Sequence, residues 1–107
     1  MNENELAEQF HQEMLGIYTN TVKECDYRPK ELLRMIVEHG GLKAAKMLIN
    51  SLKESEAFMK LRECERLDLT VEAYAIKTEF EKLFTEEERQ TAKERLEKHG
   101  YEFEQAR

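Results

Sequence analysis

The 107-residue sequence has very little of several residue types: two cysteines, one proline, four glycines and no tryptophan. Two cysteines are too few for a disulfide scaffold, so we expect Cys25 and Cys64 to be reduced thiols that pack as small hydrophobic side chains. No apolar run approaches the roughly 20 residues that span a bilayer. The acidic first residues also lack the basic-then-apolar order of a signal peptide. We therefore expect a cytoplasmic protein without a membrane segment.

What the sequence does contain is typical of a helical globular domain. Forty per cent of the residues are hydrophobic, and the net charge is −6. Glutamate, lysine, leucine and alanine are abundant, whereas runs of β-branched residues are scarce, which favours helices over strands. A chain of this length buries one modest core. We predict a single all-α domain over residues 1–107, built as a compact orthogonal bundle of six or seven short helices.

Apolar spacing and capping residues give the expected order of the first helices. The first helix starts after an N-cap at Asn4 and runs for five or six turns. Its apolar stripe consists of Leu6, Phe10, Met14, Ile17, Tyr18 and Val22. The second follows Pro29, which suits the first position of a helix, and reads Lys30 to His39 with Val37 on its buried side before it stops at Gly40. The third runs from Gly41 through Leu52.

The later part of the chain carries the clearest helix-start signals. Ser55 is expected to cap a fourth helix. Asp68 or Thr70 is expected to cap a short buried helix, and residues 67–71 are not expected to form a strand. Capping boxes are predicted at Thr78-x-x-Glu81 and Thr85-x-x-Glu88, the second of which starts the final helix. After that helix, Tyr101 and Phe103 are expected to fold back onto the core.

The sequence contains few of the residue patterns that catalytic sites require. Glu8-x-x-His11 has the spacing of one carboxylate–histidine pair, but the second pair of a di-iron bundle is missing. The two cysteines have no C-x-x-C framework for zinc. No nucleophile elbow, glycine-rich phosphate loop or acid-x-lysine triplet occurs. We therefore predict no enzyme activity, no metal and no cofactor.

Residues 29–53 are the one place where nucleic-acid binding is worth considering. Their helix–Gly-Gly–helix order resembles a helix-turn-helix, whose second helix enters the major groove. That second helix would present Lys43, Lys46, Asn50 and Lys53. Three lysines neutralise few phosphates, and the acidic remainder of the chain repels them. A helix-turn-helix-like nucleic-acid binder is therefore the alternative hypothesis, and a plain helical hairpin with solvated lysines is the structural interpretation.

From Glu24 onward the sequence resembles an uncharacterised bacterial helical module, found as small proteins and as C-terminal appendages near nuclease and phage-defence genes. The resemblance is carried by Glu24-Cys25-x-Tyr27, Gly40-Gly41 with Ala44, Ala45 and Leu48, Arg66-Leu67-Asp68-Leu69-Thr70-Val71-Glu72-Ala73, Leu83-Phe84-Thr85-Glu86-Glu87-Glu88-Arg89, and Gly100-Tyr101. It covers residues 25–107 and leaves residues 1–24 outside. It implies a complex-forming or nucleic-acid-related role and supplies no catalytic residue.

The leading hypothesis is a non-enzymatic helical interaction module that acts through a protein partner or by self-association. The first helix is longer than a small bundle needs, so Phe10, Met14 and Tyr18 are candidates for a partner-facing stripe. Alternatively, that stripe packs in the core. Arg66 and Asp68 are the other candidates for partner recognition. Their structural alternative is that Arg66 pairs with a neighbouring acid.

Overall fold

The computed structural model describes residues 2–101, and every regular element within them is a helix. The α-helices are α1 (Glu3–Cys25), α2 (Lys30–His39), α3 (Gly41–Asn50), α4 (Glu56–Glu63), α5 (Val71–Ala75) and α6 (Glu86–Lys98). Two 3-10 helices, η1 (Leu67–Leu69) and η2 (Thr78–Leu83), flank α5. The predicted all-α bundle is confirmed, and residues 67–71 lie in η1 and the start of α5 rather than in a strand.

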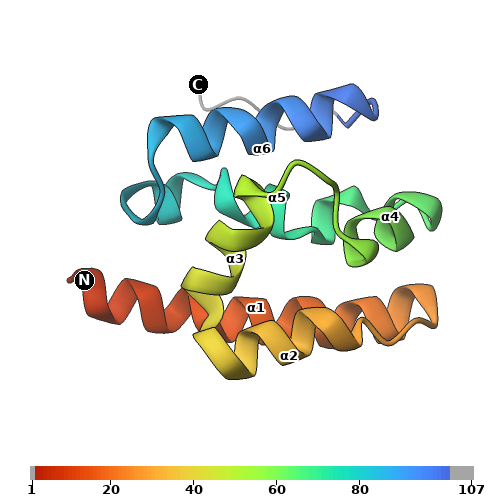
Figure 1. Cartoon of the computed structure of the whole chain (residues 1–107), viewed down its shortest axis with the longest axis horizontal. Helices are drawn as coiled ribbons and strands as arrows, with labels where there is room; N and C mark the ends of the chain where they lie inside the picture. The colour runs from red at the N-terminus through yellow and green to blue at the C-terminus, as the bar shows by residue number, and fades with distance from the viewer. Residues whose placement is uncertain (1, 102–107) are drawn as a thin grey trace.

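Helix α3 joins the two sides of the molecule. Figure 1 shows α1 and α2 along one side and α6 on the opposite side, with α3 crossing between them. Helix α3 packs against α1 and α2 at one end and against α5 and α6 at the other. The placement of α3 therefore decides how the two sides meet.

The main core gathers side chains from α1, α2, α3, α5, η2 and α6 and contains three phenylalanines. The Phe10 ring meets the Phe80 and Phe84 rings edge-on, with centroids 5.0 and 5.3 Å apart. A smaller cluster joins Phe58, Ala73 and Leu96, with Tyr101 packed against it. The predicted inward position of Tyr101 is thus confirmed, whereas Phe103 lies outside the described residues.

Most of the predicted helix boundaries are confirmed. The Ser55 hydroxyl accepts a hydrogen bond from the Phe58 N–H at the start of α4. Thr85 and Glu88 form the predicted capping box of α6. Of the two candidates for the cap of α5, Thr70 is the one used, because its hydroxyl accepts from the backbone of the third helical residue.

Three predictions about helix starts are wrong. The N-cap of α1 is Asn2 rather than Asn4, because Asn2 and Glu5 form a reciprocal capping box two residues earlier. Thr78 makes no capping hydrogen bond, since η2 starts after Lys77 as a 3-10 helix. Pro29 precedes the first residue of α2 instead of occupying it.

Two apolar residues that were assigned to helix interiors lie on the surface. Val37 is 75% exposed because α2 buries the opposite face, which carries Leu32, Met35 and Ile36. Leu52 is fully exposed because α3 ends at Asn50 and leaves it in the following loop.

The prediction of two reduced thiols is contradicted by a disulfide between Cys25 and Cys64. The bond links the last residue of α1 to the residue that follows α4, with a Cα–Cα distance of 5.8 Å. The two cysteines are 39 residues apart in the sequence, so only the fold brings them together. Because disulfides are uncommon in reducing compartments, this pairing is atypical of the cytoplasmic protein expected from the cysteine count.

Candidate interaction surface

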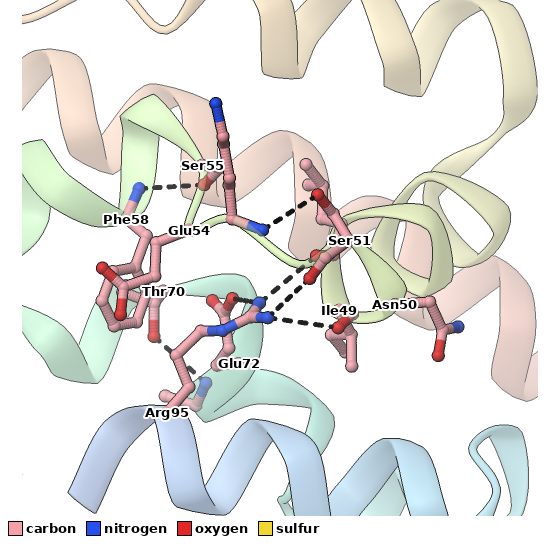
Figure 2. Close-up of polar contacts among 12 residues, drawn as sticks. Ile49, Asn50, Ser51, Glu54, Ser55, Phe58, Thr70, Glu72 and Arg95 are labelled. Atoms are coloured by element: carbon pink, nitrogen blue, oxygen red, sulfur yellow. Dashed lines mark hydrogen bonds and ion pairs between the residues drawn. The ribbon is translucent and has the colours of Figure 1, made fainter. Parts of the chain in front are cut away.

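A buried ion pair fixes the C-terminal end of α3. The Arg95 guanidinium on α6 lies 2.9 Å from the Glu72 carboxylate on α5, and their side chains are only 9% and 2% exposed. Arg95 also donates to the carbonyl oxygens of Leu48, Ile49 and Ser51, the last at 2.8 Å. Figure 2 shows Arg95 reaching from α6 to the carbonyls of Ile49 and Ser51, with Glu72 beside its guanidinium. A cation thereby occupies the negative end of the α3 dipole.

The pKa of Glu72 lies above its ordinary value in spite of this partner. Burial raises the pKa of Glu72, and the hydrogen bond from Arg95 opposes the shift. Loss of Arg95 would remove that opposition and leave a carboxylate without a cation in the protein interior.

The N-terminal end of α3 is capped by a histidine from another helix. Gly40 supplies no side chain, and the Gly41 N–H donates instead to His11 Nδ1 on α1 at 2.8 Å. This contact requires a glycine, because a Cβ on Gly41 would lie 2.6 Å from the His11 Cα. Helix α3 is therefore held at both ends by side chains distant in sequence.

Two of the candidate nucleic-acid residues are occupied within the fold. Lys46 Nζ lies 2.7 Å from the Glu88 carboxylate, and the Asn50 amide donates to the other oxygen of Glu88 at 3.0 Å. Burial pushes the pKa of Glu88 upward, but these hydrogen bonds, with one from the Thr85 backbone, hold it below its usual value. Lys43 and Lys53 are exposed. The four residues therefore do not present one basic face.

An open apolar groove of about 340 Å³ lies between α2, α3 and the start of α4. Its lining residues are Pro29, Glu31, Leu32, Met35, Met47, Leu48, Ser51, Ser55, Glu56 and Ala57. Most of the apolar residues that line the groove are buried or half-buried, whereas Met47 is 41% exposed. Met47 therefore presents a flexible apolar side chain at the opening of the groove.

The charged groups in the lining of the groove are acidic. Glu31 shares the Arg34 guanidinium with Glu38, so these three residues together carry one negative charge. Glu56 receives a hydrogen bond from Tyr27, and this bond raises the pKa of the Tyr27 phenol to about 12. The groove thus combines an apolar floor with a negative rim.

The loop between α3 and α4, residues 51–55, borders the groove and is fixed at both ends. Arg95 holds the Ser51 carbonyl, and the Glu54 carboxylate lies 2.6 Å from His99 Nε2. The Lys53 backbone N–H donates to the Ser51 hydroxyl. Leu52 is held in this loop with its side chain fully in solvent.

The predicted partner-facing stripe on α1 is wrong for its two main residues. Phe10 and Met14 are completely buried, because this face of α1 packs on α3 and η2. Tyr18 is half-buried. The competing interpretation, that the stripe packs in the core, holds for Phe10 and Met14.

Arg66 and Asp68 form a surface ion pair. Arg66 donates to Asp68 and also to Glu24 at the end of α1, at 3.0 and 2.7 Å. The predicted pairing of Arg66 with a neighbouring acid is confirmed, and the hydrogen bond from Arg66 lowers the pKa of Asp68. Their proposed role in partner recognition stays a prediction.

No metal-binding cluster forms within residues 2–101, where no three histidine, cysteine or acidic side chains gather as ligands. His11 of the Glu8–His11 pair is engaged with Gly41. In the same part of the chain, no helix is both long and apolar enough to cross a membrane.

Sequence reasoning missed the groove because its lining comes from three helices and a loop. Met47 was available as a signal, because it lies out of phase with the buried positions of α3, whereas Leu52 continues those positions in phase and gave no such signal. Comparison with known proteins adds no guide to the site: no protein family, curated protein or solved structure matches this chain. The resemblance carried by residues 25–107 therefore stays a prediction.

Proposed function

We propose that this chain is a non-enzymatic protein-interaction module whose contact surface is the groove between α2, α3 and α4. The observation that carries the proposal is the combination of an apolar floor with Met47 exposed at its opening. The groove volume of about 340 Å³ falls within the range of about 300–1,000 Å³ typical of ligand sites.

The chemistry of the groove defines the class of partner. An apolar floor selects a leucine-like or methionine-like side chain, which loses contact with water on binding. The acidic rim at Glu31 and Glu56 selects a basic residue next to that side chain. We therefore propose a protein segment with an apolar anchor and an adjacent lysine or arginine as the occupant.

Fluorescence anisotropy with a labelled amphipathic peptide of leucine and lysine tests this function. We expect binding with a Kd below about 100 µM, and at least tenfold weaker binding of the same peptide with glutamate in place of lysine. Met47→Glu should weaken binding by a similar factor because it places a charge in the groove. Val37→Glu is the matched control, since Val37 is an exposed apolar residue outside the groove lining.

Equal binding by both peptides would contradict the role of the acidic rim. Equal binding by the Met47 and Val37 variants would place the contact elsewhere on the surface. Absence of binding by the leucine–lysine peptide would overturn the proposed function.

The alternative function, nucleic-acid binding by the 29–53 helix pair, receives less support from the contacts. Lys46 and Asn50 are engaged with Glu88, which leaves Lys43 and Lys53 as exposed candidates. A gel-shift assay at 150 mM salt separates the two functions, because weak phosphate contacts are lost at that concentration. Sub-micromolar binding that disappears in a Lys43→Ala/Lys53→Ala variant would favour the alternative.

A further inference from the structure

We infer that the occupant of the groove is a second copy of this chain, which inserts Leu52 into it and pairs Lys53 with the acidic rim. The inference rests on the proposed function and names its partner. It follows from an exposed leucine in the loop that borders the groove, where Leu52 and Lys53 line a neighbouring hollow beside α6.

Leu52 has the properties of an anchor residue. It is fully exposed, although leucine loses favourable free energy by remaining in water. Its loop is not free to withdraw it, because Arg95 binds the Ser51 carbonyl on one side and His99 binds Glu54 on the other. A loop that these contacts already fix loses little backbone freedom on association. The fold therefore presents Leu52 in advance of any contact.

The location of the loop allows a two-fold contact. Ser51 and Ser55, which flank Leu52 in the loop, themselves line the groove. In a two-fold dimer each copy uses the same patch, so one copy's Leu52 enters the partner's groove while the partner's Leu52 enters its own. An axis that passes near the loop would satisfy both contacts at once.

Charge complementarity selects this occupant. Lys53 follows Leu52 directly, and no ion pair engages its ammonium group within residues 2–101. Glu56 on the groove rim is exposed and has the neutral Tyr27 hydroxyl, not a cation, as its hydrogen-bond partner. An apolar side chain followed by a cation is the pattern that the groove selects, and residues 52–53 supply it.

Sedimentation equilibrium on the intact oxidised protein tests the inference. We expect a monomer–dimer equilibrium with a Kd between about 10 µM and 1 mM, as for small interfaces. Leu52→Glu should weaken dimerisation at least tenfold, whereas Val37→Glu, the same type of change at another exposed site, should not. Circular dichroism melts establish that each variant is folded.

A charge exchange gives the most specific result. Lys53→Glu and Glu56→Lys should each weaken the dimer severalfold, and the double variant should restore it, because the pair is re-formed with opposite signs. A dimer that Leu52→Glu leaves intact, or a double variant as weak as the single ones, would overturn the arrangement.

The outcome also separates this inference from the proposed function. A wild-type protein that remains monomeric at 1 mM while its groove still binds the leucine–lysine peptide would overturn the second copy as the occupant. The interaction function would then stand with a different protein partner. A monomer that also fails to bind the peptide would overturn both.

Discussion

Breaking the Glu72–Arg95 pair should lower the free energy of unfolding by an amount that depends on pH. In Arg95→Met the carbonyls at the end of α3 lose their donor, and Glu72, 2% exposed, loses its cation. Breaking a buried pair on one side costs about 3–5 kcal/mol at neutral pH. Burial already raises the pKa of Glu72, and removal of Arg95 raises it further.

The sign of the pH effect follows from this shift. A carboxyl group whose pKa is higher in the folded protein than its unfolded value of about 4.3 binds its proton more tightly in the folded state. The protein therefore loses stability as pH rises from the unfolded pKa to the folded pKa. The loss caused by Arg95→Met should therefore be largest at pH 7 and shrink toward pH 5, by as much as about 1.4 kcal/mol per pH unit. A second change, Glu72→Gln, should remove the pH dependence, because no buried charge remains.

Urea unfolding followed by circular dichroism at 222 nm measures these differences in a domain of this size. The experiment compares wild type, Arg95→Met and Arg95→Met/Glu72→Gln at pH 5 and pH 7. A loss below about 1 kcal/mol at pH 7, or one that is equal at both pH values, would refute the reasoning.

Three further predictions concern the covalent and local structure. Reduction of the disulfide, or Cys25→Ala/Cys64→Ala, should lower the free energy of unfolding by about 4 kcal/mol, because the bond closes a loop over 39 residues. Thiol titration of the unfolded, unreduced protein should detect no free thiol. Gly41→Ala should cost about 1–3 kcal/mol because its Cβ would overlap the His11 backbone. Its control, Gly16→Ala, has open space and should gain up to about 1 kcal/mol in urea unfolding. Thr70→Ala should lower the free energy of unfolding by about 1 kcal/mol, because it removes the cap of α5. Asp68→Ala should lower it by less than about 0.5 kcal/mol, because Asp68 is exposed and forms only a surface ion pair. A larger loss for Asp68→Ala than for Thr70→Ala would contradict the assignment of Thr70 as the cap.

Local signals in the sequence predict most of the fold. The capping box at Thr85 and the cap at Ser55 involve residues three apart, and both form as predicted. The Gly40-Gly41 turn also separates α2 from α3 where expected. Such features depend on neighbours within one turn, which a single sequence displays directly. The prediction of Asn4 as the N-cap is wrong because Asn2, two residues earlier, is an equivalent cap. The prediction of a capping box at Thr78 is wrong because a 3-10 helix forms there.

The candidate site could not be predicted in the same way, because each of its parts depends on distant contacts. The disulfide joins residues 39 apart, and Arg95 meets the Ser51 carbonyl 44 residues away. Local spacing leaves the long α1 stripe open to assignment either to a partner or to the core, because the helices that cover it are not evident from that spacing. Exposure of Leu52 follows from the end of α3, and helix ends are the least predictable feature of a sequence.

Methyl NMR of ¹³C-labelled methionine during titration with the leucine–lysine peptide tests the central claim most directly. Met35 and Met47 line the groove, whereas Met14 lies in the core with no exposed surface. The account predicts that the methyl signals of Met35 and Met47 shift with saturation while that of Met14 stays in place. Signals that all remain unchanged, or a shift of Met14 without Met47, would contradict a binding function for the groove.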